Sequence, residues 1–223
     1  MLSGLLAAAQ ADYRAGVTAF DRGDYPSALA EWRPLAERGE AEAQFNLGVL
    51  YDGGLGVERD HARAGVWYRF AAEQGHARAQ FNLAVLFASG LGVTRDLAEA
   101  ARWYERAAAQ GQIEAQFNLG VLHEDGAGVA QSHVRAAYWY RLAAYRGHAK
   151  AQFNLAILYA SGQGVPLDGV TAYAWYDAAA GNGNAKARFN RDLLAESLTP
   201  EQLLAARQLA ADFAKRYRSR PES

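Results

Sequence analysis

The feature that most constrains this chain is a sequence repeat of 36 residues. Phenylalanines recur at that spacing at Phe45, Phe81, Phe117, Phe153 and Phe189, and tryptophans at Trp67, Trp103, Trp139 and Trp175. The segment Gln-Phe-Asn-Leu is identical in the first four copies, and no insertion or deletion breaks the register between about residues 41 and 190. Such regularity predicts a stack of similar supersecondary units rather than one globular core.

Each repeat is interpreted as two helices. The first, over 41–51, is apolar on most sides, as expected for a helix packed between neighbours. A glycine-rich connection at 52–57 breaks it. The second helix begins at an N-cap whose side-chain oxygen satisfies free backbone N–H groups, and it ends at a glycine suited to the left-handed conformation. The N-caps are Asp60, Asp96, Ser132 and Asp168, and the glycines are Gly75, Gly111, Gly147 and Gly183. The predicted fold class is therefore all-α, a solenoid of helix-turn-helix repeats.

The ends of the predicted solenoid, which spans 12–223, differ from its middle. Four full repeats are predicted at 41–76, 77–112, 113–148 and 149–184, with partial repeats at 12–40 and 185–223. In the N-terminal partial repeat, Pro34 is expected to kink or split the second helix. The C-terminal one should end in a capping helix that starts at Thr199 and Pro200 and covers the last apolar seam.

The first eleven residues raise the question of export. Residues 1–11 are apolar and rich in small side chains, and Ala9-Gln10-Ala11 is typical of a signal-peptidase site, although no basic segment precedes it. We interpret residues 1–11 as the remnant of an export signal that begins upstream, which predicts a periplasmic or secreted protein. The alternative is a short apolar helix that covers the first repeat of a cytoplasmic protein.

Composition excludes several kinds of partner and chemistry. With 23 basic and 24 acidic residues, the chain has no charge excess that would favour nucleic acid or an anionic membrane. The absence of cysteine excludes disulfides, thiol catalysis and cysteine-ligated metals. The sequence contains no run of 18 apolar residues, so no membrane span is predicted.

The sequence motifs do not predict an active site. The Gly-x-Gly elements follow helices and recur four times, which favours turns over phosphate loops. The five histidines form no zinc-protease pattern, and surface histidines are favoured over a zinc pocket shared between repeats. No serine elbow of the Gly-x-Ser-x-Gly type occurs. We therefore predict no catalytic residue, no metal and no cofactor.

A second period of 72 residues lies within the first. Gly48 and Gly120 alternate with Ala84 and Ala156, and His76 and His148 alternate with Gln112 and Asn184. Charge alternates as well, in two series: along the first helices Glu42, Arg78, Glu114, Lys150 and Lys186, and along the second helices Arg69, Glu105, Arg141 and Asp177. Two interpretations remain open: a ladder of ion pairs between neighbouring repeats, or a solvated face of mixed charge.

Residues 41–51, the Gly-x-Gly-Val turn and the Trp-Tyr-x-x-Ala-Ala-x-x-Gly segment at 67–75 together resemble the Sel-one-like repeat, a relative of the tetratricopeptide repeat. The resemblance covers four whole units and two partial ones. It implies a right-handed superhelix whose first helices line the concave side. It also implies adaptor or scaffold roles, many of them in bacterial envelopes, signalling and host contact. One cysteine-rich bacterial branch is associated with β-lactam binding, but this chain has no cysteine.

A stripe along the first helix of each pair is the predicted binding surface, because its positions share one helical face. It would offer phenylalanines and aliphatic residues flanked by charge, which suits an amphipathic helix or an extended peptide. The candidate partner-binding residues are Glu42, Phe45, Val49, Asp52, Arg78, Phe81, Val85, Glu114, Phe117, Val121, Glu124, Lys150, Phe153 and Ile157. The alternative is that the phenylalanines are packed between helices.

Three functions follow from these patterns. The first is a non-enzymatic scaffold that binds a protein or peptide in its concave groove. The second is binding or hydrolysis of a cell-wall glycan or a β-lactam. The third is architectural assembly through the end faces of the stack. The sequence predicts neither the partner nor the oligomeric state.

Overall fold

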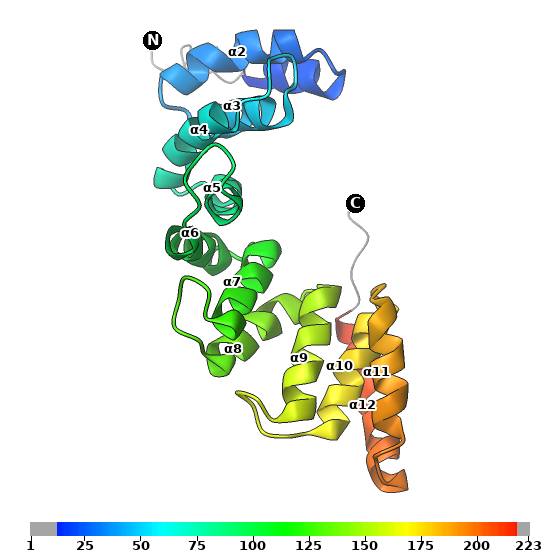
Figure 1. The fold of residues 1–223 in the computed structure, drawn as a ribbon. Helices are drawn as coiled ribbons and strands as arrows, with labels where there is room; N and C mark the ends of the chain where they lie inside the picture. The colour runs from blue at the N-terminus through cyan, green and yellow to red at the C-terminus, as the bar shows by residue number, and fades with distance from the viewer. Residues whose placement is uncertain (1–12, 218–223) are drawn as a thin grey trace, which may run out of the picture. The chain divides into compact units, whose positions relative to one another are not determined.

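The computed structural model describes residues 13–217, which are folded into α-helices and short connections (Figure 1). The chain divides into two compact units, Met1–Gln110 and Gly111–Ser223. After a first helix over 13–21, the N-terminal unit contains α2 (Tyr25–Glu37), α3 (Ala41–Gly53), α4 (His61–Glu73), α5 (Ala77–Ser89) and α6 (Leu97–Ala109). The C-terminal unit contains α7 (Ile113–Asp125), α8 (His133–Ala144), α9 (Ala149–Ser161), α10 (Gly169–Gly181), α11 (Ala185–Ala195) and α12 (Pro200–Arg216). The predicted export remnant at residues 1–11 lies outside the described residues.

The helices follow the sequence repeat. The first helices of successive pairs begin at Ala41, Ala77, Ile113, Ala149 and Ala185, which are 36 residues apart. The predicted all-α stack of helix pairs is therefore confirmed. Among residues 13–217, no helix is both long enough and apolar enough to cross a membrane.

The second helices begin at the predicted N-caps. Asp60, Ser132 and Asp168 accept a hydrogen bond from the backbone N–H three residues on, and Asp96 accepts from both Ala98 and Glu99. Each first helix runs two residues past the predicted end, for example to Gly53. It stops there because Gly54 adopts φ +68°, a left-handed conformation that glycine tolerates at little cost.

The connection between paired helices needs glycine for a second reason, because its backbone lies very close to the backbone of a neighbouring helix. Gly92 has φ +68°, and a Cβ atom built on it would lie 2.3 Å from the backbone nitrogen of Ala62, at the start of α4. The loop after α5 therefore rests directly on the first turn of the preceding pair's second helix. The loop glycine Gly92 is therefore a packing residue.

Within the N-terminal unit, buried glutamines join a helix pair to the one before it. The Gln44 side-chain amide donates to the Ala36 carbonyl over 3.0 Å, and its own carbonyl accepts from Gln74 over 2.7 Å. Gln80 repeats the arrangement with Ala72 and Gln110. These amides add a second hydrogen bond to carbonyls in the last turn of the preceding second helix, which also accept from the Gly39 and Gly75 N–H groups.

Asparagines of the Gln-Phe-Asn-Leu segments join neighbouring pairs as well. The Asn46 side-chain amide donates to the Tyr13 hydroxyl over 3.1 Å, and Asn82 is hydrogen-bonded to the Tyr68 hydroxyl. Since each buried tyrosine needs a partner for its hydroxyl, the asparagines hold these aromatic side chains in the seam. Their role is therefore structural.

The two ends depart from the prediction in detail. Pro34 lies inside α2, but it does not split the helix, which continues to Glu37. At the other end, α12 starts with the predicted capping box of Thr199 and Gln202. Helix α12 packs along α10, where Trp175 contacts Phe213 at a ring distance of 4.4 Å, and it leaves Phe189 of α11 exposed. The capping helix therefore covers the seam of α10 and not the outer face of α11.

Candidate functional site

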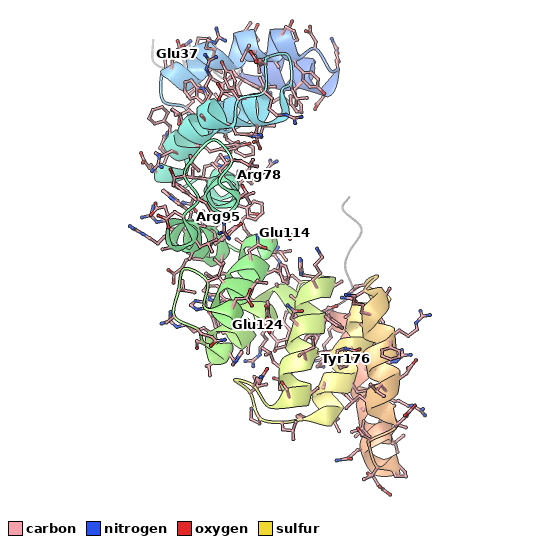
Figure 2. All side chains as sticks on the ribbon, in the orientation of Figure 1. Glu37, Arg78, Arg95, Glu114, Glu124 and Tyr176 are labelled. Carbon is pink, nitrogen blue, oxygen red and sulfur yellow. The ribbon has the colours of Figure 1, made fainter. Side chains whose placement is uncertain are left out.

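The predicted stripe divides into exposed charges and partly buried apolar residues. Glu42, Arg78, Glu114 and Lys150 are exposed, and Glu114 and Glu124 lie at opposite ends of α7 (Figure 2). The aliphatic members and three of the four phenylalanines are partly buried: Val49, Val85, Val121, Ile157, Phe81, Phe117 and Phe153. The fourth phenylalanine, Phe45, is only 3 % exposed.

Phe45 is covered by two side chains of the next pair. The His76 ring stacks on it at 4.5 Å between centroids, and the Arg78 guanidinium lies over it at 4.6 Å. His76 is held in place because its Nδ1 accepts from the Ala79 N–H and its Nε2 lies 3.2 Å from the Glu42 carboxylate. Phe45 therefore offers almost no surface to a partner.

In the C-terminal unit, Phe117 and Phe153 differ in what covers their rings. His148 caps α9 through Nδ1, contacts Phe117 at 4.6 Å between ring centroids and pairs with Glu114. At the equivalent place before α11, Asn184 is the N-cap and bonds to the Lys186 and Ala187 N–H groups. An asparagine side chain is too short to lie across a phenylalanine in the way that the imidazole does. Phe153 therefore has no imidazole lid.

A hollow of about 500 Å³ opens at this place, which we name the lysine groove. It is lined by Phe117, Ala149, Lys150, Phe153, Asn154, Asn182, Gly183, Asn184, Ala185 and Lys186. Three of these, Phe117, Lys150 and Phe153, belong to the predicted stripe. The structure thus brings together one part of the predicted surface, within the C-terminal unit.

The free polar groups of the lysine groove are cationic. Lys150 and Lys186 are exposed and have no ion-pair partner among residues 13–217. The asparagine side chains are already engaged, since Asn154 is hydrogen-bonded to Tyr140, Asn182 to Gln152, and Asn184 to its own helix. The groove can therefore offer two ammonium groups beside two aromatic rings.

The two acidic residues Asp52 and Glu124 of the stripe accept hydrogen bonds from buried tyrosine hydroxyls. Asp52 accepts from the Tyr68 hydroxyl over 3.4 Å and lies 2.7 Å from His61 Nδ1, and Glu124 accepts from the Tyr140 hydroxyl. Burial, together with the adjacent carboxylate, raises the pKa of both tyrosines well above the usual value of 10. These hydroxyls therefore stay protonated and act as hydrogen-bond donors.

In the predicted ladder along the first helices, the charged residues do not pair with one another. Glu42 pairs with His76, while Arg78 lies over the Phe45 ring, and Glu114 pairs with His148. The carboxylates of Glu42 and Glu114 are therefore paired with His76 and His148 and not with the basic residues of the series. Lys150 and Lys186, the other members of the series, are exposed, in agreement with the alternative of a solvated face of mixed charge.

Three serine side chains take part in hydrogen bonds of their own helices. The hydroxyls of Ser89 and Ser161 donate to carbonyls of their own helices, and Ser132 caps α8. Residues 13–217 contain no cluster of three or more His, Asp or Glu side chains that could hold a metal ion. His76 and His148 act as helix caps and as lids over phenylalanines, and His61 pairs with Asp52.

The family follows from comparison with known proteins. The model of the Sel1 repeat matches at residues 41–76, 77–112, 113–148 and 149–184, which are the boundaries predicted from the sequence. The chain belongs to the Sel1 repeat family. The Sel1 repeat commonly mediates contacts between proteins and is generally a non-catalytic scaffold. A search of curated protein sequences gives no match.

Solved structures show the same fold. A Sel1 repeat protein from Oxalobacter formigenes is 31% identical, with a TM-score of 0.77 over 92% of this chain and 85% of that one. A protective antigen of uropathogenic Escherichia coli is 32% identical, with a TM-score of 0.57 over 86% of this chain. The present chain spans 49% of that antigen's length. A putative Sel1 repeat protein from Klebsiella pneumoniae, 20% identical with a TM-score of 0.51, has the same fold.

Sequence reasoning missed the part of the lysine groove at the junction between the fourth Sel1 repeat and the partial repeat that follows it. Asn182, Asn184 and Lys186 line the groove but were not among the predicted binding residues. The signal that points to them is the change from histidine at positions 76 and 148 to asparagine at position 184, because this change removes the lid.

Proposed function

We propose that this Sel1 repeat protein is a non-enzymatic adaptor that binds a segment of a partner protein in the lysine groove. The observation that carries the proposal is the hollow itself, in which Phe117 and Phe153 lie beside two lysines without ion-pair partners. Hollows with aromatic walls are where binding energy concentrates in protein interfaces, because a side chain that enters them is fully desolvated.

The chemistry of the groove favours an acidic and apolar segment. The aromatic rings would contact a leucine or phenylalanine of the partner, and the ammonium groups of Lys150 and Lys186 would contact a flanking carboxylate. Each asparagine of the groove is held by at least one hydrogen bond within the protein, so the rings and the ammonium groups would be the main contacts to a partner. Specificity would therefore come from side-chain charge and size.

A panel of fluorescent peptides tests the proposal. Eight-residue peptides with a central Leu-Phe pair flanked by glutamates are compared, by fluorescence anisotropy, with peptides that carry lysines instead. We expect the acidic peptides to bind more tightly, and Phe153→Ala or Lys150→Glu to weaken that binding by on the order of tenfold. Binding should also weaken as salt is added.

Lys215→Glu is the matched control, because Lys215 is an exposed lysine on α12 outside the groove. It makes the same charge change and should leave peptide affinity close to that of the wild type. Equal binding of acidic and basic peptides, or no binding by either, would contradict the proposed groove chemistry. Equal loss with Lys215→Glu would show that only net charge matters.

A further inference from the structure

The outer face of α11 is apolar and has no partner in the described part of the chain. Phe189 is 70 % exposed and Leu193 is 57 % exposed, one helical turn apart. In earlier repeats the equivalent phenylalanines contact a tyrosine of their own second helix, as Phe153 contacts Tyr176 at 5.7 Å between ring centroids. The partial repeat has no such helix, because α12 packs along α10 instead (Figure 1).

A hollow lies next to these side chains, and we name it the end hollow. It has a volume of about 540 Å³ and is lined by Ala160, Tyr176, Asn190, Leu193, Leu194, Glu196 and Ser197. Two of its lining residues are held together, because the Asn190 side chain is hydrogen-bonded to the hydroxyl of Tyr176 on α10. Tyr176 is labelled in Figure 2. One face of α11 therefore carries both an exposed aromatic ring and a hollow of a size to receive one.

The charges on the same face are arranged symmetrically. Lys186, Phe189, Leu193 and Glu196, which we name the α11 stripe, share one side of the helix because they are spaced by three, four and three residues. About the centre at Arg191, Phe189 mirrors Leu193, and Lys186 mirrors Glu196. Arg191 itself is engaged by Asp177 at 2.6 Å and Asp192 at 2.7 Å, so it does not disturb the pattern.

Because of this symmetry, the α11 stripe is complementary to a second copy of itself. If a second α11 lies antiparallel to the first about a two-fold axis, each Phe189 meets the Leu193 and the end hollow of the other copy. Each Lys186 then meets a Glu196, twice in the pair. An interface in which the same patch meets itself is the usual form of a two-fold homodimer.

We propose that the α11 stripe is a docking site for a second copy of this chain, which pairs through α11 in the antiparallel direction. The proposal does not rest on the lysine groove, although Lys186 takes part in both surfaces. A single helix and its adjacent hollow form a small interface, which is typical of weak and reversible association. The pair should therefore form as concentration rises and dissociate on dilution.

Charge exchange tests the pairing. The full chain is studied by sedimentation equilibrium up to about 0.5 mM, a concentration that populates a weak dimer. Lys186→Glu alone and Glu196→Lys alone each place two like-charged contacts in the pair, and each should weaken dimerisation by on the order of tenfold. An equimolar mixture of the two variants restores both attractions, so it should form heterodimers that neither variant forms with itself.

Two further variants separate the interface from folding. Phe189→Asp should give a monomer with an unchanged far-ultraviolet circular dichroism spectrum. Leu204→Asp, which changes a 61 % exposed leucine on α12, should dimerise as the wild type does. A wild type that stays monomeric throughout overturns the proposal, and so does a dimer that Phe189→Asp does not affect. Failure of the mixed variants to associate excludes the antiparallel arrangement.

Discussion

The replacement Gly48→Ala tests how closely the two helices of a Sel1 repeat approach. Gly48 lies on α3 against Tyr68 of α4, a tyrosine that is only 1 % exposed. A Cβ atom at Gly48 would lie 2.4, 2.5 and 3.1 Å from three atoms of the Tyr68 ring, where ordinary contacts begin at 3.4 Å. The ring would have to move by roughly 1 Å to restore a normal contact.

Two effects of opposite sign decide the outcome. Alanine in a helix interior is favoured over glycine by about 1 kcal/mol. Overpacking a core costs about 1–3 kcal/mol, and the upper part of that range applies here because Tyr68 is buried and hydrogen-bonded to Asp52 and Asn82. We therefore expect Gly48→Ala to lower the free energy of unfolding by about 1–2 kcal/mol.

Urea unfolding followed by circular dichroism measures the change, with Gly181→Ala as the matched control. Gly181 ends α10, and a Cβ atom there would meet nothing within 4 Å. That replacement should raise the free energy of unfolding by roughly 0.5 kcal/mol. If Gly48→Ala stabilised the protein as Gly181→Ala does, the tight contact with Tyr68 would be refuted.

Three more predictions concern buried polar groups. Burial raises the pKa of Tyr68 and Tyr140, so these side chains keep their protons while unfolded tyrosines lose them above about pH 10. Stability should be constant up to that pH and fall above it, and urea midpoints should fall less in a Tyr68→Phe/Tyr140→Phe variant. His148→Asn keeps the N-cap of α9, so in thermal unfolding it should be more stable than His148→Ala by about 1 kcal/mol. Gln152→Ala removes three hydrogen bonds, to the Ala144 and Tyr217 carbonyls and from the Asn182 amide, and should cost about 1–3 kcal/mol in urea unfolding. A loss below about 0.5 kcal/mol, the size of a surface change, would contradict the bridge.

Helix boundaries were predictable because their signals are local. An aspartate at position 60 or 96 caps the next helix through its own side chain, and a glycine at position 54 ends a helix through its own φ. The partner of α12 was not predictable in the same way. Its apolar face shows that the helix packs, but the choice of α10 depends on Trp175 being available as a contact.

The candidate site was predicted in part for a similar reason. Phe117, Lys150 and Phe153 could be assigned to one face from helical spacing alone. Which phenylalanine is covered depends on contacts between repeats, such as His148 with Phe117, and single-helix periodicity does not encode them. The ion-pair ladder failed as a prediction because spacing alone does not show that His76 reaches Glu42 before Arg78 does.

The glutamine bridges have a consequence for how such a chain changes length. Gln44 finds its partners 8 residues before it and 30 residues after it, and Gln80 does the same. All the groups that such a glutamine requires are thus encoded within about one repeat of sequence. Duplication or loss of a 36-residue segment therefore carries a complete set of donors and acceptors with it. For the Gln44 and Gln80 bridges, expansion of the array by such a segment would therefore keep each buried amide paired.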